Sequence, residues 1–335
     1  MKTSTNMIAV LGSGSWASAI ASIILEHDDL SINWWIREEE IIEGLLETQR
    51  NPLYLSEIEF DTDRIHLSSD IKEVIRMSSD IIFVIPSAFL DRSLEGLTPE
   101  DFRGKRIHSA IKGLVPETGQ ITTDYLHDKF GISYDDMTVI SGPSHAEEAA
   151  QQKLTYLTIA SKNSALAQEI SKSISCRFVR TTVSEDIQGI EYATVLKNIY
   201  ALAAGVCKGL GYGDNLMAVL ISNAMQEMDE FLNHLHPMDC RQLEKFPYLG
   251  DLLVTAYSQH SRNRRFGSMI GLGYSVRGAQ LEMNMVAEGY YATKSIEKIR
   301  QQYGISMPIV ETIHEILYNN GTPRRVMKKL VENLK

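Results

Sequence analysis

A glycine-rich turn near the start of the chain constrains the fold more than any other feature. The turn, GSGSWA at residues 12–17, follows an apolar run at residues 7–11 and precedes a segment with helical apolar spacing. Gly12 permits a tight strand-to-helix turn, Gly14 lets a pyrophosphate approach the backbone, and the third position packs helix on strand and tolerates Ala17. The free N–H groups at the helix start would face the phosphates. The motif predicts a Rossmann-type, dinucleotide-binding domain.

The first half of the sequence alternates short apolar runs with helical segments. Helical spacing is clearest at residues 17–26 and 164–173. This alternation predicts a mainly parallel sheet covered by helices. The runs expected to form strands are residues 7–11, 31–36, 81–85, 106–109, 137–140, 156–160 and 177–180.

The character of the sequence changes near Ile187. Beyond it, apolar residues recur at spacings of three and four, as in residues 189–206 and 216–232, which is typical of helices. We therefore expect an α/β fold in which a dinucleotide-binding Rossmann domain, residues 1–188, precedes an all-α domain. That second domain, residues 189–335, would bind the substrate and carry the catalytic groups.

The end of the second expected strand bears on the choice of dinucleotide. NAD sites usually carry an acidic residue there, which binds the ribose 2′-hydroxyl. This strand ends instead in Arg37, and the acids Glu38 to Glu40 follow it. Arg37 could pair with the 2′-phosphate of NADP, stack on adenine with either cofactor, or be a solvated surface arginine. We expect NADP or NAD to bind, with a weak preference for NADPH.

Composition and charge argue against several other classes of protein. The 335 residues are 44% apolar and 23% charged, as in ordinary globular proteins, and the formal net charge is −10. That sign disfavours general binding to nucleic acid or to an anionic membrane. The sequence has no run of about 20 apolar residues that could span a bilayer, and its N-terminus does not resemble a signal peptide. We expect a cytoplasmic protein.

The cysteines predict neither disulfides nor a metal site. Cys176, Cys207 and Cys240 lie far apart in the sequence, without a CxxC pattern. His234, His236 and Cys240 could be imagined as ligands, but no second cluster of ligands accompanies them.

The residues around Lys197 point to proton transfer. Lys197 lies among apolar residues of an expected helix, where lost hydration would lower its pKa toward neutrality. The alternative is a lysine whose long side chain reaches solvent from an amphipathic helix. Farther along, Asp251 and Thr255 share one helical face through i, i+4 spacing.

A basic turn follows at residues 261–265, with the sequence SRNRR. Its serine, amide and guanidinium groups suit a substrate phosphate, because arginine can contact phosphate through two hydrogen bonds. The alternative is a basic loop that forms ion pairs with the rest of this acidic protein.

Seven motifs together resemble one enzyme family, the bacterial-type NAD(P)-dependent sn-glycerol-3-phosphate dehydrogenases. They occur in one order over nearly the whole chain. They are GSGSWA at 12–17, SAIKG at 109–113, GPSHAEE at 142–148, LKN at 196–198, GLGYGDN at 209–215, LGDLLVT at 249–255 and SRNRRFG at 261–267. The family fold, a Rossmann domain joined to an all-helical domain, agrees with the two-domain prediction.

The resemblance implies a role for each matching position. Lys197 would be the proton donor and acceptor, Lys112 a second active-site lysine, and Asp251 and Thr255 would lie beside Lys197. The implied substrate-binding residues are Lys112, Gly142, Ser144, Lys197, Asp251, Ser261, Arg262 and Asn263. The implied cofactor-binding residues are Gly12, Gly14, Ser15, Trp16, Arg37, Lys112, Ala146, Arg262, Val286 and Glu288.

The activity implied by the resemblance is the reversible reduction of dihydroxyacetone phosphate to sn-glycerol 3-phosphate, for phospholipid biosynthesis. A homodimer is compatible with the sequence. The chain departs from the family pattern at Ala17 and over residues 192–195, where the family usually has glycines. The bulk at 192–195 could narrow the pocket or only repack the helix.

Two other interpretations remain open at this point. The first is another dehydrogenase with a Rossmann and a helical domain, which would act on a hydroxy acid or an opine. The second is a regulator that senses the dinucleotide without catalysis, against which the two lysines argue. The substrate of the first alternative would carry a carboxylate in place of the phosphate. A comparison of phosphorylated with carboxylated substrates would therefore distinguish it from a glycerol-3-phosphate dehydrogenase.

Overall fold

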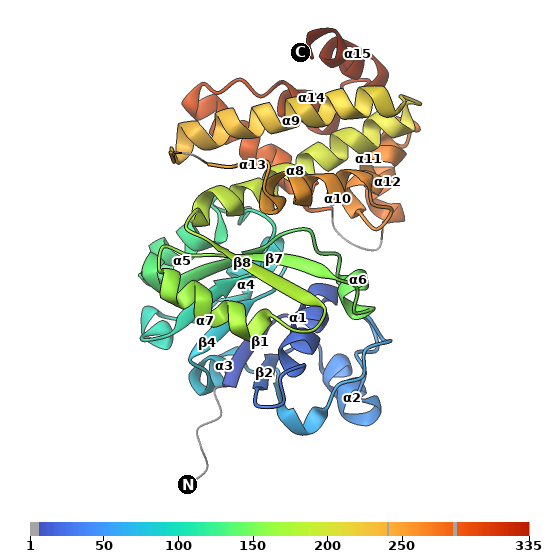
Figure 1. The fold of residues 1–335 in the computed structure, drawn as a ribbon. Helices are drawn as coiled ribbons and strands as arrows, with labels where there is room; N and C mark the ends of the chain where they lie inside the picture. The colour runs from blue at the N-terminus through green and yellow to red at the C-terminus, as the bar shows by residue number, and fades with distance from the viewer. Residues whose placement is uncertain (1–6, 240, 284–286, 335) are drawn as a thin grey trace. The chain divides into compact units, whose positions relative to one another are not determined.

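The computed structural model describes residues 7–239, 241–283 and 287–334, and it divides into two compact units (Figure 1). Unit 1 extends to Ile111 and resumes over Gln120–Ile187. Unit 2 consists of the short segment Lys112–Gly119 and the chain from Gln188 onward. Lys112 therefore belongs to the same unit as the helical half of the chain, although its segment interrupts unit 1 in the sequence.

A mainly parallel sheet forms the centre of unit 1. In the described residues it has eight strands in the order β3-β2-β1-β4-β5-β6-β7-β8, and only the β6–β7 pair is antiparallel. Its first six strands have the Rossmann order. The strands are β1 (Met7–Leu11), β2 (Ser31–Trp35), β3 (Ile65–Ser68), β4 (Asp80–Phe83), β5 (Arg106–Ser109), β6 (Met137–Ser141), β7 (Thr155–Ala160) and β8 (Val179–Ser184).

The sequence prediction was wrong at both edges of this sheet. It missed β3, whose four residues are all only half-buried and include no apolar run. It placed the last strand at 177–180, whereas β8 begins at Val179 and continues to Ser184. Val179 is the only fully buried residue of β8, so this edge strand lacks the apolar signal that marks the central strands.

Helices cover both faces of the sheet, because successive strand residues point to opposite sides. Ile82 of β4 belongs to a core with α1 and α7, whereas its neighbour Phe83 packs near Phe102, which packs on Phe130 of α5. The helices of unit 1 are α1 (Ser15–Leu25), α2 (Glu39–Thr48), α3 (Ile71–Met77), α4 (Leu90–Ser93), α5 (Thr122–Phe130), α6 (Ala146–Ala150) and α7 (Ser164–Ile174).

Unit 2 is helical and is organised around one long buried helix, α8. From residue 189 to 207 every residue of α8 is buried, and most of these residues are apolar, as is typical of a core helix. The α/β-plus-all-α fold class is thus confirmed. The helices are α8 (Ile187–Gly209), α9 (Asp214–Leu235), α10 (Asp251–Tyr257), α11 (Arg262–Gly271), α12 (Val276–Glu282), α13 (Glu288–Tyr303), α14 (Pro308–Tyr318) and α15 (Pro323–Asn333). None of the helices in the described ranges has the length and apolar character needed to cross a membrane.

Glycines let α8 and α11 cross at very short range. A Cβ atom on Gly267 would lie 2.1 Å from the carbonyl oxygen of Leu202, and a Cβ on Gly205 would lie 2.1 Å from that of Arg264. Both obstacles are backbone atoms, which cannot move aside as a flexible side chain could. The crossing therefore requires glycine at these two positions.

We expect Gly267→Ala to lower the free energy of unfolding by about 2–4 kcal/mol, because the two helices must separate to admit the methyl group. Gly213→Ala is the matched control, since a Cβ there would meet nothing within 4 Å. Its expected cost is below about 1 kcal/mol. Chemical denaturation of both variants measures the difference, and equal losses would contradict the close crossing.

Candidate active site

Three side chains fix the turn between β1 and α1 in unit 1. Trp34 Nε1 donates a hydrogen bond to the carbonyl oxygen of Gly12 (2.7 Å). Asn51 Nδ2 donates to the carbonyl oxygen of Ser13 (3.1 Å), and Ser13 Oγ donates to Glu38 Oε2 (2.7 Å). The protein itself therefore holds the shape of the turn.

The two glycines of the turn meet different demands. Gly12 has φ +133°, and a Cβ there would lie 2.8 Å from the carbonyl oxygen of Val84. A Cβ on Gly14 would meet nothing within 4 Å, so the backbone there faces open space. Gly14 is also the N-cap of α1, whose first residues are Ser15 and Trp16. Because no side chain covers the backbone at Gly14, a ligand can approach the start of α1 closely. This arrangement suits the pyrophosphate of a dinucleotide.

Arg37 lies just after β2 and is paired with its neighbour. Its Nη2 and Nε atoms lie 2.6 Å and 3.1 Å from Glu38 Oε1. Partial burial raises the pKa of Glu38, but hydrogen bonds from Ser13 and Arg37 outweigh this and leave the pKa below its ordinary value. The sequence analysis did not assign Glu38 to the site, because its contact with Ser13 spans 25 residues of sequence.

A second turn follows β6 at the same edge of the sheet. Gly142 has φ +128°, and a Cβ there would lie 2.7 Å from the carbonyl oxygen of Tyr156. Ser144 Oγ donates to the carbonyl oxygen of Gly142 (2.9 Å), and Ala146 begins α6. Because β1 and β6 run parallel through β4 and β5, the turns at Gly12 and Gly142 lie at their common carboxyl edge. Ligands of open α/β sheets bind at this edge.

In unit 2, two lysines meet one buried carboxylate. Asp251 is 1% exposed; its Oδ1 lies 2.5 Å from Lys197 Nζ and its Oδ2 lies 4.0 Å from Lys112 Nζ. Burial lowers the pKa of Lys197 to about 8; Asp251 opposes this shift and the charge of Lys112 adds to it. Lys197 can therefore gain and lose a proton near neutral pH.

Local structure fixes where the carboxylate lies. A single π-helical turn, Phe246–Gly250, leads directly into α10, of which Asp251 is the first residue. Irregular turns of this kind are frequent at functional sites. Thr255 Oγ1 donates to the carbonyl oxygen of Asp251 (2.6 Å), as their i, i+4 spacing allows. Thr255 thus supports the helix that carries the carboxylate.

Two buried asparagines connect the elements around this cluster. Asn198 Nδ2 donates to the carbonyl oxygen of Lys112 (2.9 Å), and Asn263 Nδ2 donates to Asn198 Oδ1 (2.9 Å). Asn263 Oδ1 in turn accepts from the N–H of Gly289 (2.9 Å). The sequence analysis missed Asn198, for which the only signal was its place beside Lys197. Asn263, which was predicted to bind the substrate, joins α8, α11 and α13 through its amide.

The remaining predicted residues of unit 2 lie at two helix starts. Ser261 is the N-cap of α11, and its Oγ accepts from the N–H of Arg264 (3.2 Å). Arg262, the first residue of α11, is exposed. Glu288 is the first residue of α13, and Val286 lies outside the described residues.

The unusual bulk at residues 192–195 packs within the helical unit. The ring of Tyr192 is 5% exposed, with centroids 5.4 Å from Phe231 and 5.5 Å from His236. Tyr192 of α8 therefore packs against Phe231 of α9 and against His236, which follows α9.

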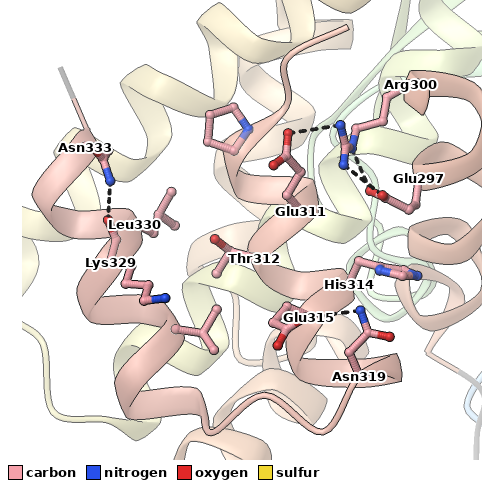
Figure 2. A pocket seen from close by; sticks show the side chains of 12 residues that line it. Glu297, Arg300, Glu311, Thr312, His314, Glu315, Asn319, Lys329, Leu330 and Asn333 are labelled. Carbon is pink, nitrogen blue, oxygen red and sulfur yellow. Dashed lines mark hydrogen bonds and ion pairs between the residues drawn. The ribbon is translucent and has the colours of Figure 1, made fainter. Parts of the chain in front are cut away.

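A charged groove of about 400 Å³ lies elsewhere in unit 2, among α13, α14 and α15 (Figure 2). Arg300 contacts both Glu297 (2.6 Å) and Glu311 (3.1 Å) there. None of the residues that line it belongs to the lysine cluster, and its Arg300 is compensated by Glu297 and Glu311. Among all described residues, no group of three His, Cys, Asp or Glu side chains could hold a metal ion, and Cys240 lies outside them.

Comparison with known proteins identifies the family. Residues 7–167 match the model for the N-terminus of NAD-dependent glycerol-3-phosphate dehydrogenase, and residues 186–328 match that for its C-terminus. A Salinibacter ruber protein named glycerol-3-phosphate dehydrogenase (NAD(P)+) 2 is 34% identical over 97% of this chain and 94% of its own. A Bacillus velezensis protein named glycerol-3-phosphate dehydrogenase (NAD(P)+) is 31% identical over 98% and 94%.

A solved structure agrees with these matches. The crystal structure of glycerol-3-phosphate dehydrogenase from Coxiella burnetii covers 99% of this chain and 100% of its own, with a TM-score of 0.90 and 28% identity. The resemblance drawn from the seven motifs is thereby confirmed. The chain belongs to the NAD-dependent glycerol-3-phosphate dehydrogenase family.

Proposed function

We propose that this chain is an NAD(P)-dependent oxidoreductase that reversibly reduces dihydroxyacetone phosphate to sn-glycerol 3-phosphate. The observation that carries the proposal is the cluster in which the buried Lys197 and Asp251 meet the half-buried Lys112, in a chain of this family. Residues 1–188 would bind the dinucleotide, and residues 189–335 would bind the substrate and transfer the proton. The product would supply phospholipid synthesis in the cytoplasm.

The phosphate turn would hold the cofactor through Gly12, Gly14 and the start of α1, with Ser15, Trp16 and Arg37 nearby. When bound, a nicotinamide dinucleotide supplies hydride chemistry. The work left to the side chains is proton transfer and charge stabilisation. Lys197 donates a proton to the developing alkoxide of the substrate, and in the reverse direction it takes the proton back.

Each neighbour of Lys197 has a separate task. Lys112 stabilises negative charge on the substrate oxygen as the alkoxide forms. Asp251 keeps Lys197 oriented and favours its charged form, because the carboxylate raises the pKa that burial lowers. Asn198 holds the backbone of Lys112 in place through its carbonyl oxygen.

The substrate phosphate would bind at the start of α11. Arg262 is exposed there, and the N–H groups of the helix start favour an anion. We expect Arg262→Ala to raise KM for dihydroxyacetone phosphate by about 10–100-fold while kcat changes less. Arg265→Ala is the control, because Arg265 is an exposed arginine of the same helix. Steady-state kinetics would contradict the assignment if KM were unchanged or if both variants shifted it equally.

A substrate comparison tests the proposed function against its enzymatic rival. With NADH or NADPH, we expect rapid reduction of dihydroxyacetone phosphate and little reduction of unphosphorylated dihydroxyacetone or of 2-oxo acids. Preferred turnover of a 2-oxo acid would instead establish a hydroxy-acid dehydrogenase on the same scaffold.

A further inference from the structure

Glu38 has an unusual position between the phosphate turn and Arg37. It is the N-cap residue of α2, yet its side chain makes no capping hydrogen bond to that helix. One carboxylate oxygen accepts from Ser13 Oγ (2.7 Å), and the other accepts from two nitrogens of Arg37 (2.6 and 3.1 Å). The carboxylate is thus fixed within one hydrogen bond of the turn that would hold the cofactor phosphates.

This arrangement changes what Arg37 can offer a ligand. Its Nη2 and Nε donors both point at the carboxylate of Glu38, so the positive charge is largely compensated. Glu39 and Glu40, both exposed in the first turn of α2, add further negative charge nearby. A 2′-phosphate brought to Arg37 would have to share it with Glu38 and would be repelled by that carboxylate, whereas solvent screens the charges of the exposed Glu39 and Glu40.

A ribose 2′-hydroxyl meets no such obstacle. The hydroxyl is neutral, and it can donate a hydrogen bond to an ionised carboxylate such as that of Glu38, which is only partly buried. Acidic side chains at the end of the second Rossmann strand bind this hydroxyl in NAD sites.

We propose that Glu38 sets the nucleotide preference of this chain, and that it favours NAD(H) over NADP(H). The proposal differs from the weak preference for NADPH that the sequence led us to expect from Arg37. The inference rests on the proposed function only in taking a dinucleotide as the ligand.

Calorimetric titration of the ligand-free enzyme with NAD+ and NADP+ tests the proposal without turnover. The two ligands differ only by the 2′-phosphate. We expect wild-type enzyme to bind NAD+ at least about tenfold more tightly than NADP+. Glu38→Gln keeps the size of the side chain and removes its charge, and we expect it to shift the ratio of the two dissociation constants toward NADP+ by about tenfold or more.

Two further variants isolate the cause of that shift. Glu40→Gln removes the same charge from the same helical turn without touching the pair, and we expect it to move the ratio by less than about twofold. Adding Arg37→Ala to Glu38→Gln should abolish the gain for NADP+, because the released arginine would provide it.

The outcomes separate this inference from the proposed function. If both nucleotides bind and the wild type prefers NADP+, or if Glu38→Gln leaves the ratio unchanged, Glu38 is not the determinant, while the dinucleotide site stands. If neither nucleotide binds to the folded wild-type enzyme, both the inference and the proposed cofactor site are wrong.

Discussion

Replacing Lys197 by methionine is expected to lower kcat for the reduction of dihydroxyacetone phosphate by about 10²–10⁴-fold, which is the usual contribution of general acid catalysis. The side chain is 5% exposed, so water cannot easily deliver the proton in its place. Methionine keeps the length and apolar stem of lysine and removes only the ammonium group. Affinity for the dinucleotide should stay within about twofold, since the proposed site for the cofactor phosphates is the turn after β1.

Lys208→Met provides the control for this prediction. Lys208 lies on the same helix, α8, but it is exposed near the helix end. We expect its kcat to equal that of the wild type. Circular dichroism verifies that Lys197→Met folds, and calorimetry verifies that it binds the nucleotide. A near wild-type kcat in this variant would contradict the assignment of Lys197 as proton donor.

Asp251→Asn should produce the second large effect, on both stability and activity. Removal of one partner from a buried ion pair leaves the other charge uncompensated and costs about 3–5 kcal/mol of unfolding free energy. The carboxylate also raises the pKa of Lys197, so its loss should move that pKa below 8. At pH 8 less of the lysine is then protonated, and we expect kcat for reduction to fall by more than about tenfold.

A control variant at a buried carboxylate of unit 1 separates the effect on stability from the effect on activity. Asp80 is 2% exposed and pairs with Arg106 (2.6 Å) and His108 (3.1 Å). Asp80→Asn should also destabilise the protein, but it should leave the pH dependence of turnover unchanged. For Asp251→Asn, the activity should partly recover as the pH is lowered. The same pH profile in both variants would show that Asp251 acts only on stability.

The parts of the fold that the sequence revealed depend on local patterns. The turn at Gly12 and Gly14 is recognisable because its two glycines lie between an apolar run and a segment with helical spacing. The apolar residues around Lys197 left two alternatives, a buried lysine or one that reaches solvent, and the structure shows that Lys197 is buried. Both edge strands escaped prediction, because β3 and β8 bury too little to carry an apolar signal.

What the sequence could not reveal are contacts between residues far apart in the chain. Asn198 reaches Lys112 across 86 positions, and Lys197 reaches Asp251 across 54. The Lys197–Asp251 contact was expected only through the family resemblance. Apart from its place beside Lys197, nothing in the sequence indicated the contact that Asn198 makes, because the pattern of an apolar helix does not specify the partner of a polar residue within it.

The pH dependence of the reaction in both directions tests the central claim most directly. If Lys197 exchanges the proton with a pKa of about 8, kcat/KM for reduction should be constant below that pH and fall above it, because the ammonium form is the acid. For oxidation of glycerol 3-phosphate, kcat/KM should rise up to about pH 8 and then level, because the amine form is the base. Opposite profiles of this kind are the predicted result. Flat profiles in both directions between about pH 6.5 and 9.5 would contradict the assignment of proton transfer to Lys197.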